Sequence, residues 1–116
     1  MAKGAKKSEL ELHLETRMIQ TGLSGFEKQY KAVPGRKWAW DFAFPAAKLL
    51  IEVNGGTFIK GGHSTGLGIR RDYEKLNAAT VNGWRCLIFD GKMVRDDTAS
   101  AVIAEAILAG TEPAKE

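Results

Sequence analysis

Apolar positions change their spacing along the chain, and these changes predict a mixture of helices and strands. From Leu10 to Ile19 the apolar residues recur every three or four positions, which is typical of a helix with one buried face. Ser8 is expected to cap this helix, because Glu11 stands three residues later, where it would complete a capping box. The helix is expected to run to Gly22.

A period of two residues follows, and it predicts strands. Residues 26–33 are expected to form a first strand, and Pro34-Gly35 is a strong turn signal after it. Residues 36–44 alternate large aromatic side chains with small or charged ones, the pattern of a strand with one packed face. A turn at 45–48 leads into residues 49–53, whose continuous apolar run indicates a strand covered on both faces.

The second half of the chain alternates helix and strand. Residues 69–82 are expected to form a helix that ends at Gly83 in a left-handed cap. Residues 84–89 then form a short strand, expected to return parallel to its neighbour in the sheet through a right-handed crossover. A last helix is expected over 97–110 or 98–110. The predicted order is therefore helix, three strands, helix, strand, helix.

Length and composition describe one ordinary domain. The chain has 116 residues, of which 44% are hydrophobic and 27% charged. We expect a single domain over residues 8–110, between a flexible basic tail (1–7) and a frayed C-terminal tail (111–116). The net charge of +3 is compatible with a nucleic-acid partner, but by itself it is weak evidence for one. Cys86 is the only cysteine, which excludes an internal disulfide and a zinc–thiolate cluster.

The sequence predicts no contact with a membrane. No stretch approaches the roughly 20 consecutive apolar residues of a membrane span. The first seven residues are basic but lack the apolar run of a signal peptide. A cytoplasmic location is therefore expected.

A pair of carboxylates on neighbouring strands is the most informative feature. If the hairpin turns symmetrically about the Ala46–Ala47 bond, paired residue numbers sum to 93, and Asp41 then faces Glu52 with Cβ atoms about 5 Å apart. Like charges facing each other destabilise a sheet, and no basic residue lies opposite in this register. A divalent metal between the carboxylates would remove the repulsion. A bulge or one-residue slip would instead place them on opposite faces.

Basic residues gather in and after a glycine-rich segment. Residues 55–68 hold six glycines but lack the spacing of a phosphate-binding loop or a dinucleotide fingerprint. The segment contains Lys60 and His63, and Arg70 and Arg71 follow it. Four potential cations beside two carboxylates would suit a phosphodiester substrate, with a solvated flexible loop as the alternative.

Two further assignments stay open at the level of sequence. Glu11 and Glu15 are one helical turn apart, and either could supply a third carboxylate, although Glu11 has the capping role as a competing explanation. Lys75 could pair with Asp72 on the helix surface, or it could stabilise charge on a phosphate. With only two histidines in the chain, a multi-histidine metal centre is excluded.

The carboxylate motif resembles that of the PD-(D/E)XK nuclease superfamily, which has an Asp at a strand end and Glu-x-Lys on the next strand. The matching residues are Asp41-Phe-Ala-Phe-Pro and Glu52-Val-Asn-Gly-Gly. The sequence of these two segments is most similar to that of the very-short-patch-repair-like and small phage-type endonuclease branch. The resemblance covers about residues 8–89. Asn54 departs from it by occupying the lysine position, which makes Lys75 the leading substitute and Lys60 the second.

The resemblance implies a fold and a mechanism. The fold would be a restriction-endonuclease-like α/β core, with a mixed four-stranded sheet flanked by helices. Asp41, Glu52 and the main-chain carbonyl of Val53 would hold Mg²⁺, for which Mn²⁺ could substitute, and Glu11 would contribute directly or through water. Lys75 would stabilise the charge on the phosphate.

The implied activity is that of a DNA endonuclease, structure-selective because so small a domain has little surface for reading bases. Cutting of junctions would need two active sites, which suggests a homodimer. Two alternatives remain from the sequence: a non-catalytic nucleic-acid-binding module with the same fold, favoured by Asn54, and an adaptor protein whose acidic hairpin is solvated.

Overall fold

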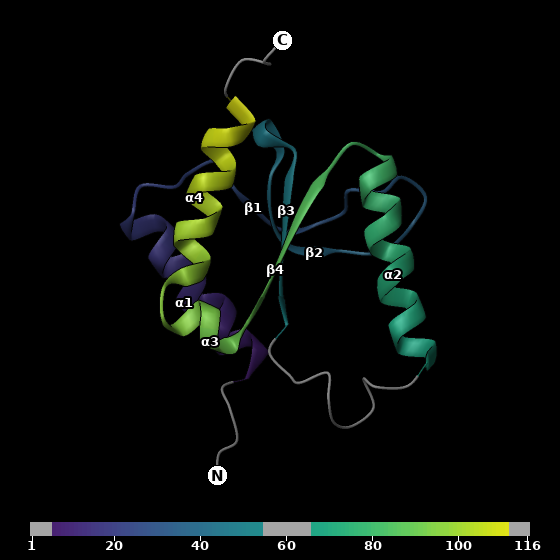
Figure 1. The fold of residues 1–116 in the computed structure, drawn as a ribbon, viewed down its shortest axis with the longest axis horizontal. Coiled ribbons are helices and arrows are strands. Elements are labelled where there is room, and N and C mark those ends of the chain that lie inside the picture. The colour runs from purple at the N-terminus through teal and green to yellow at the C-terminus, as the bar shows by residue number, and fades with distance from the viewer. Residues whose placement is uncertain (1–5, 55–65, 112–116) are drawn as a thin grey trace.

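The computed structural model describes residues 6–54 and 66–111, with the side chains of 66–69 and 111 left out of the description. In this part of the chain a four-stranded mixed sheet is flanked by helices on both faces (Figure 1). The elements in order are α1 (Lys7–Gln20), β1 (Glu27–Tyr30), β2 (Trp40–Phe44), the 3₁₀ turn η1 (Pro45–Ala47), β3 (Leu49–Asn54), α2 (Gly66–Val81), β4 (Arg85–Asp90), α3 (Gly91–Arg95) and α4 (Thr98–Thr111).

The predicted fold class and element order are confirmed, with differences at the element ends. The short helix α3 was not predicted. The first two strands are shorter than the 26–33 and 36–44 expected, because pairing stops at Tyr30↔Trp40 and the residues between them form a long connection. Gly35 has a φ of 82° in this connection, as a turn there requires. The predicted tail segments 1–5 and 112–116 lie outside the described residues.

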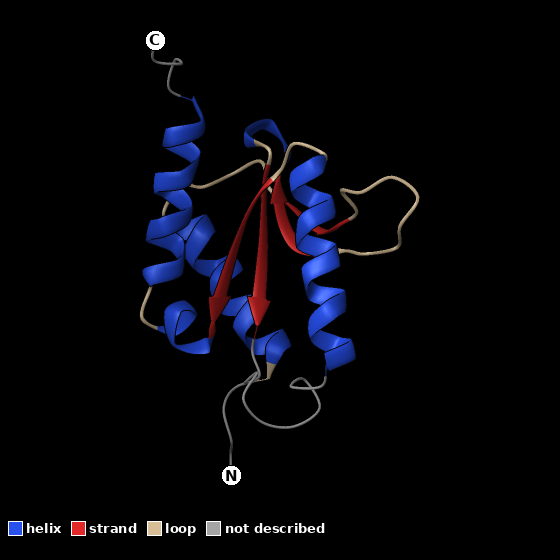
Figure 2. Ribbon diagram, turned by 45° about the vertical axis from the view of Figure 1, so that its right-hand side comes forward, coloured by secondary structure: helices blue, strands red, loops and turns tan. Residues whose placement is uncertain are grey.

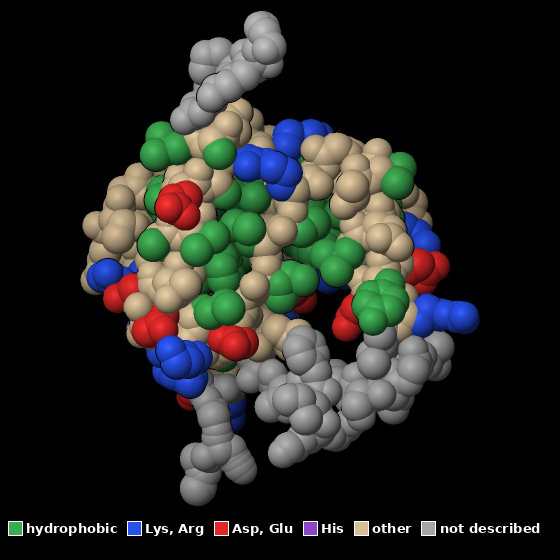
Figure 3. All heavy atoms as spheres, in the orientation of Figure 1, with side chains coloured by type: hydrophobic (Ala, Val, Ile, Leu, Met, Phe, Trp, Pro, Cys, Tyr) green, Lys and Arg blue, Asp and Glu red, His purple; other side chains and the backbone are tan. Residues whose placement is uncertain are grey.

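The sheet has the strand order β1-β2-β3-β4, with β1, β2 and β3 antiparallel and β4 parallel to β3. The β2–β3 register pairs Phe42 with Ile51 and Phe44 with Leu49, so the pair numbers sum to 93 as predicted. β4 forms one edge of the sheet. Apolar side chains gather over this edge between α4 and α2 (Figure 3), and Ile88 of β4 is 43% exposed.

Two apolar cores cover the two faces of the sheet. The larger core lies under α1, α3 and α4 and contains Leu10, Leu14, Met18, Phe42, Phe44, Leu49, Ile51, Val53, Phe89, Val94, Ala99 and Ile103. The smaller core lies under α2 and contains Trp40, Ala43, Leu50, Ala79 and Trp84. Figure 1 shows this arrangement, with α2 on one side of the strands and the other helices opposite. β3 is therefore buried on both faces, as its apolar run predicted.

Helix α1 begins two residues earlier than a cap at Ser8 predicts, and its cap is different. Lys6 is the N-cap residue, and its backbone N–H donates to Oε1 of Glu9 at 3.3 Å. The predicted capping box of Ser8 and Glu11 is thus wrong, since Glu9 fills the position that Glu11 was expected to fill. At the other end, the N–H of Leu23 donates to the carbonyl of Met18 at 2.8 Å, closing the helix beside Gly22 (φ 87°).

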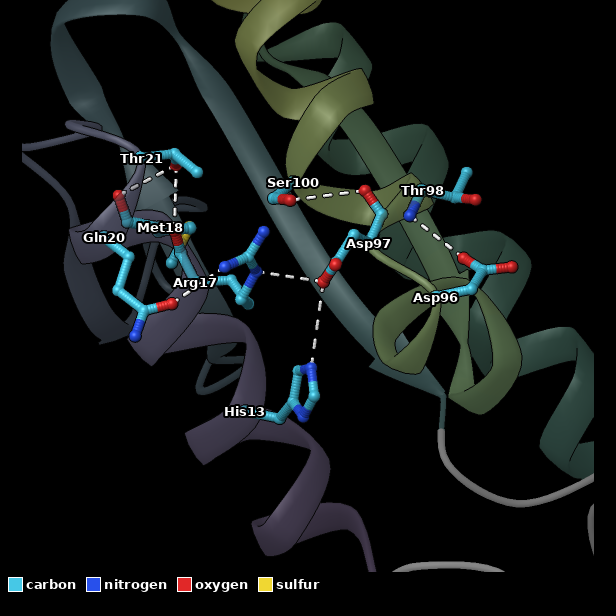
Figure 4. Close-up of polar contacts among 9 residues, drawn as sticks. All are labelled: His13, Arg17, Met18, Gln20, Thr21, Asp96, Asp97, Thr98 and Ser100. Carbon is cyan, nitrogen blue, oxygen red and sulfur yellow. Dashed lines mark hydrogen bonds and ion pairs between the residues drawn. The ribbon is translucent and has the colours of Figure 1, made fainter.

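A polar contact holds α1 against the start of α4. Nε of Arg17 donates to Oδ1 of Asp97 at 3.0 Å, and Nη1 of Arg17 donates to the side chain of Gln20 at 2.8 Å (Figure 4). Nε2 of His13 lies 3.9 Å from the same Asp97 oxygen. The contact between Arg17 and Asp97 joins residues 80 positions apart in the sequence, so it ties α1 to the segment that begins α4.

Small side chains allow α2 to approach the opposite face. Ala79 of α2 and Ala43 of β2 are both fully buried in the smaller core. Ala79 is one helical turn after Lys75, so its packing against the sheet sets how far Lys75 can reach. Among the described residues, no helix is both long enough and apolar enough to cross a membrane.

We predict that Ala79→Leu will destabilise the protein by about 1–3 kcal/mol, the usual cost of overpacking a close-packed core. The added atoms would meet the buried wall formed by Trp40 and Leu50. Thr80→Leu, at the exposed neighbouring position, is the matched control and is expected to change stability by less than about 0.5 kcal/mol. Urea denaturation of both variants measures the difference, and equal stabilities would contradict the close packing of α2.

Candidate active site

Four elements contribute side chains at one end of the sheet. Figure 2 shows the end of β3, the start of α1 and the start of α2 together at the lower end of the molecule. β3 delivers Glu52 to this end and β2 delivers Asp41, one position beyond the Phe42↔Ile51 pair. Lys7 and Glu11 come from the first turns of α1, and Lys75 comes from α2.

Asp41 is the buried centre of the cluster. The residue is only 4% exposed, and its Oδ2 accepts a 2.7 Å hydrogen bond from the backbone N–H of Val53. This bond takes the place of a strand-to-strand backbone bond where the β2–β3 ladder ends. The carboxylate therefore holds the end of β3 as well as facing the cluster, and its position is fixed by the sheet.

Glu52 lies beside Asp41, as the register predicted, and it has two basic partners. Nζ of Lys75 is 3.4 Å from Oε1 of Glu52, and Nζ of Lys7 is 3.5 Å from Oε2. No basic residue lies opposite the pair in the strand register, as expected. Both lysines come instead from helices that pack against the end of the hairpin, and strand register alone cannot show such partners.

Lys7 contacts both carboxylates at once. Its Nζ is 3.2 Å from Oδ2 of Asp41 in addition to its contact with Glu52. The sequence assigned Lys7 to a flexible tail, but it is the first residue of α1. The only signal that could have found it is helical spacing, since Lys7 precedes Glu11 by one turn and shares its face.

The structure separates the two glutamates of α1. Glu11 lies beside Asp41, close enough for the negative charges of the two carboxyls to act on each other's protonation. Glu15 instead accepts a hydrogen bond from Nζ of Lys28 on β1 at 3.2 Å. Glu11 is therefore the residue that joins the cluster, because Glu9 has taken over the capping position.

Negative charge exceeds positive charge in this cluster. Three carboxylates, Glu11, Asp41 and Glu52, face two ammonium groups. Burial, followed by the charge of Asp41, raises the pKa of Glu52 above its ordinary value despite the opposing effect of Lys75. Burial and Asp41 raise the pKa of Glu11 in the same way. The cluster thus has a deficit of cationic charge.

The pKa of Lys7 reports the same imbalance from the other side. Its partial burial works against the charged form, but the carboxylates of Glu52 and Asp41 outweigh this effect and raise the pKa. Lys7 is therefore held as an ammonium ion at neutral pH.

Lys75 is fixed from three directions. Besides Glu52, its Nζ contacts the carbonyl of Ala39 at 3.3 Å and lies 4.3 Å from the centre of a Trp40 ring. The surface pairing with Asp72 that the sequence left open is thus replaced by contacts inside the cluster. The alternation of residues 36–44 would place Trp40 on the same face as Phe42 and Phe44, but Trp40 packs in the smaller core under α2, whereas Phe42 and Phe44 lie in the larger core. At the start of β2, the strict alternation of faces has not yet begun.

The other predicted site residues do not join the carboxylate cluster in the part of the chain that the structure describes. Lys60 and His63 lie outside the described residues. Arg70 and Arg71 are exposed on α2, one turn or more before Lys75, and their role in nucleic-acid binding stays a prediction. Asn54 ends β3 opposite Asp90 of β4. None of the contacts described for the cluster involves it.

The donor set of the cluster fits a hard divalent cation. Among the described residues, no three carboxylate, imidazole or thiol groups are close enough together to hold a metal ion without other ligands. Two carboxylates already share one ammonium, however, and carboxylate oxygens are what Mg²⁺ prefers, with water and substrate oxygens completing its coordination. A metal held by Asp41 and Glu52 would occupy the region where the ammonium of Lys7 now lies.

The fold as a whole is similar to that of a solved nuclease domain. The match to the catalytic domain of the homing endonuclease I-Bth0305I covers 89% of this chain and 97% of that chain, with a TM-score of 0.68 and 18% sequence identity. Neither a protein-family model nor a curated protein sequence matches the chain. At this identity the likeness defines the fold alone: a mixed α/β architecture shared with a nuclease catalytic domain and compatible with the expected restriction-endonuclease-like core.

We predict that Glu52→Gln will stabilise the metal-free protein at pH 7 by about 1 kcal/mol, the usual size of a single stabilising replacement at a strained functional site. A pKa that is raised in the folded state means that ionisation of Glu52 costs stability as the pH rises through that pKa. Glutamine keeps the neutral form.

Thermal unfolding in EDTA between pH 3.5 and 7 tests this prediction. The advantage of Glu52→Gln should vanish at low pH, where the wild-type carboxyl is itself protonated. Glu27→Gln, at an exposed position on β1, is the control and should have no effect. Loss of stability in Glu52→Gln at pH 7 would mean that its two lysine contacts outweigh burial and Asp41.

Proposed function

We propose that this protein is a divalent-metal-dependent DNA endonuclease of the PD-(D/E)XK type, selective for branched, flap or junction DNA. The observation that carries the proposal is the arrangement of Asp41 and Glu52 around one shared ammonium, with Lys75 on the second oxygen of Glu52. Carboxylates gathered with a lysine at the end of a sheet are what metal-assisted phosphodiester hydrolysis requires.

Asp41 and Glu52, with the main-chain carbonyl of Val53, would hold Mg²⁺, and Mn²⁺ could take its place. The metal would supply Lewis-acid stabilisation of the phosphate and a more acidic bound water. Asp41 keeps its orientation because the N–H of Val53 binds the same carboxylate. Glu11, beside Asp41, would orient water in the site or accept a proton from it.

Lys75 would do the work of the motif lysine that Asn54 replaces. Its ammonium is held by the carbonyl of Ala39 and by Glu52, so it is already placed next to the carboxylates. There it would stabilise the negative charge that develops on the phosphate oxygens. This placement supports an active enzyme over the non-catalytic binding module that Asn54 suggested.

DNA would approach the end of the sheet where these residues meet. Arg70 and Arg71 on α2, with Lys60 and His63 of the preceding segment, are the proposed contacts to the sugar–phosphate backbone. Cutting both strands of a junction would need two copies of the site. A homodimer therefore stays a prediction, which light scattering with and without DNA tests.

We predict that Asp41→Asn and Glu52→Gln will each lower cleavage by at least about 10³-fold, because each removes a metal ligand. Lys75→Met should lower it by about 10²–10³-fold, the usual effect of removing one group that stabilises transition-state charge. Labelled duplex, flap, single-stranded and four-way-junction DNA, incubated with Mg²⁺, Mn²⁺ or EDTA, provide the assay.

Glu105→Gln, at an exposed position on α4, is the control for Glu11→Gln, since only Glu11 joins the cluster. Glu105→Gln should cleave as the wild type does. Metal-dependent cleavage that survives in Glu52→Gln would contradict the proposed site. Tight binding of DNA without cleavage by the wild type would support the binding module instead.

Metal binding should also be visible without DNA. A ligand that binds only the folded chain stabilises it, by about 2.7 kcal/mol at a concentration 100 times its Kd. We therefore expect Mg²⁺ or Mn²⁺ to raise the melting temperature of the wild type and to leave that of Asp41→Asn unchanged. An equal rise in both would place the bound metal elsewhere.

A further inference from the structure

A pocket opens beside the carboxylate cluster, between α1 and the edge strand β1. Its volume is about 300 Å³. Glu11 forms part of its wall, so the pocket adjoins the proposed metal site. Phe42 of β2 contributes a buried aromatic surface and Leu12 of α1 an exposed aliphatic one. The pocket therefore combines apolar surface with a wall residue, Glu11, that also belongs to the carboxylate cluster.

Polar groups complete the lining of the pocket. Lys28 of β1 and Glu15 of α1 both line it, and their 3.2 Å ion pair joins the two elements across it. Gln29 lines it from β1. An apolar surface with a few fixed polar groups is the usual construction of a site for a small planar molecule, and the volume is at the lower end for such sites.

Gln29 has an unusual backbone conformation for a strand residue. Its φ is 50°, in the left-handed region that costs non-glycine residues about 1 kcal/mol or more. The register places it opposite Asp41, because Lys28 pairs with Phe42 and Tyr30 pairs with Trp40. Gln29 thus combines a strained backbone with a place in the pocket lining, which is the kind of outlier that points to a functional role.

We propose that this pocket holds an unstacked nucleobase next to the phosphodiester bond being cut, and that the Gln29 amide hydrogen-bonds the edge of that base. The proposal rests on the proposed nuclease function and adds how the enzyme would select its DNA substrates. The amide has both donors and an acceptor, the pairing that glutamine uses with bases. Leu12, which is 63% exposed, offers apolar surface for the ring, and Phe42 lies almost fully buried in the same lining.

A pocket for an unstacked base would make the enzyme selective for branched DNA. Drawing a base out of an intact duplex costs a few kcal/mol, whereas a base at a flap, junction or single-stranded end is already partly unstacked. A pocket that must be filled before the phosphate reaches the carboxylates would therefore favour such structures without reading a sequence.

Gln29→Gly and Gln29→Asn test the assignment. Glycine removes the amide and accepts a φ of 50° without cost, so we expect the melting temperature to be unchanged or higher while kcat/KM falls about 10- to 100-fold. Asparagine keeps an amide and tolerates the left-handed region, so it should recover part of the loss. Glu27→Gly, two positions earlier on β1, is the control for a mere change of strand flexibility.

The substrate supplies the second arm of the test. An abasic nucleotide beside the mapped cleavage position should slow the wild type about as much as Gln29→Gly does, and should slow Gln29→Gly little further. A 2-aminopurine at that position should brighten when the wild type binds in Ca²⁺, and should brighten less with Gln29→Gly.

The outcomes separate the two proposals. Equal cleavage by the wild type and Gln29→Gly, or additive effects of the variant and the abasic nucleotide, would overturn the base pocket and leave the nuclease intact. Absence of metal-dependent cleavage by the wild type on every DNA tested would overturn the nuclease function.

Discussion

The hydrogen bond from the N–H of Val53 to the carboxylate of Asp41 is the contact on which the site depends. It ends the β2–β3 ladder with a side chain in place of a backbone carbonyl, which keeps a nearly buried charge at the open end of the sheet. The charge is tolerated because Lys7 shares it with Glu52. Without this arrangement, the two strands would bring two negative charges together with no positive charge or hydrogen-bond donor to compensate them.

The helices supply what the strands cannot. α1 is tied to the start of α4 through Arg17 and Asp97, and α2 is seated on the sheet by Ala79. With the packing of α1 and α2 in the two cores, these contacts help to place Lys7, Glu11 and Lys75 beside the carboxylates. The cluster still carries more carboxylates than ammonium groups, and burial followed by the charge of Asp41 raises the pKa values of Glu11 and Glu52. A cation is the simplest addition that would balance the excess of carboxylates.

Sequence reasoning succeeded where the chemistry is local or follows from register. The hairpin at Ala46–Ala47 set the pairing of β2 with β3, and so the meeting of Asp41 with Glu52. It failed where position depends on how a helix packs. Lys7 was assigned to a flexible tail. For Glu11, the sequence could not decide between a capping role and a place in the site, because the choice of Glu9 as capping residue depends on where the helix begins. The left-handed Gln29 had no sequence signal, since glutamine does not favour that conformation.

Lys7 also bears on how such a site would work. In the chain without metal, its ammonium occupies the region between the carboxylates that a divalent cation would need. Binding of the cation must therefore move Lys7, and the first turn of α1 leaves it beside Glu11 and near the pocket. An ammonium displaced from two carboxylates, next to an incoming phosphate, would find its new partner in the substrate. The same lysine would then stabilise the carboxylates in the empty site and the phosphate in the loaded one.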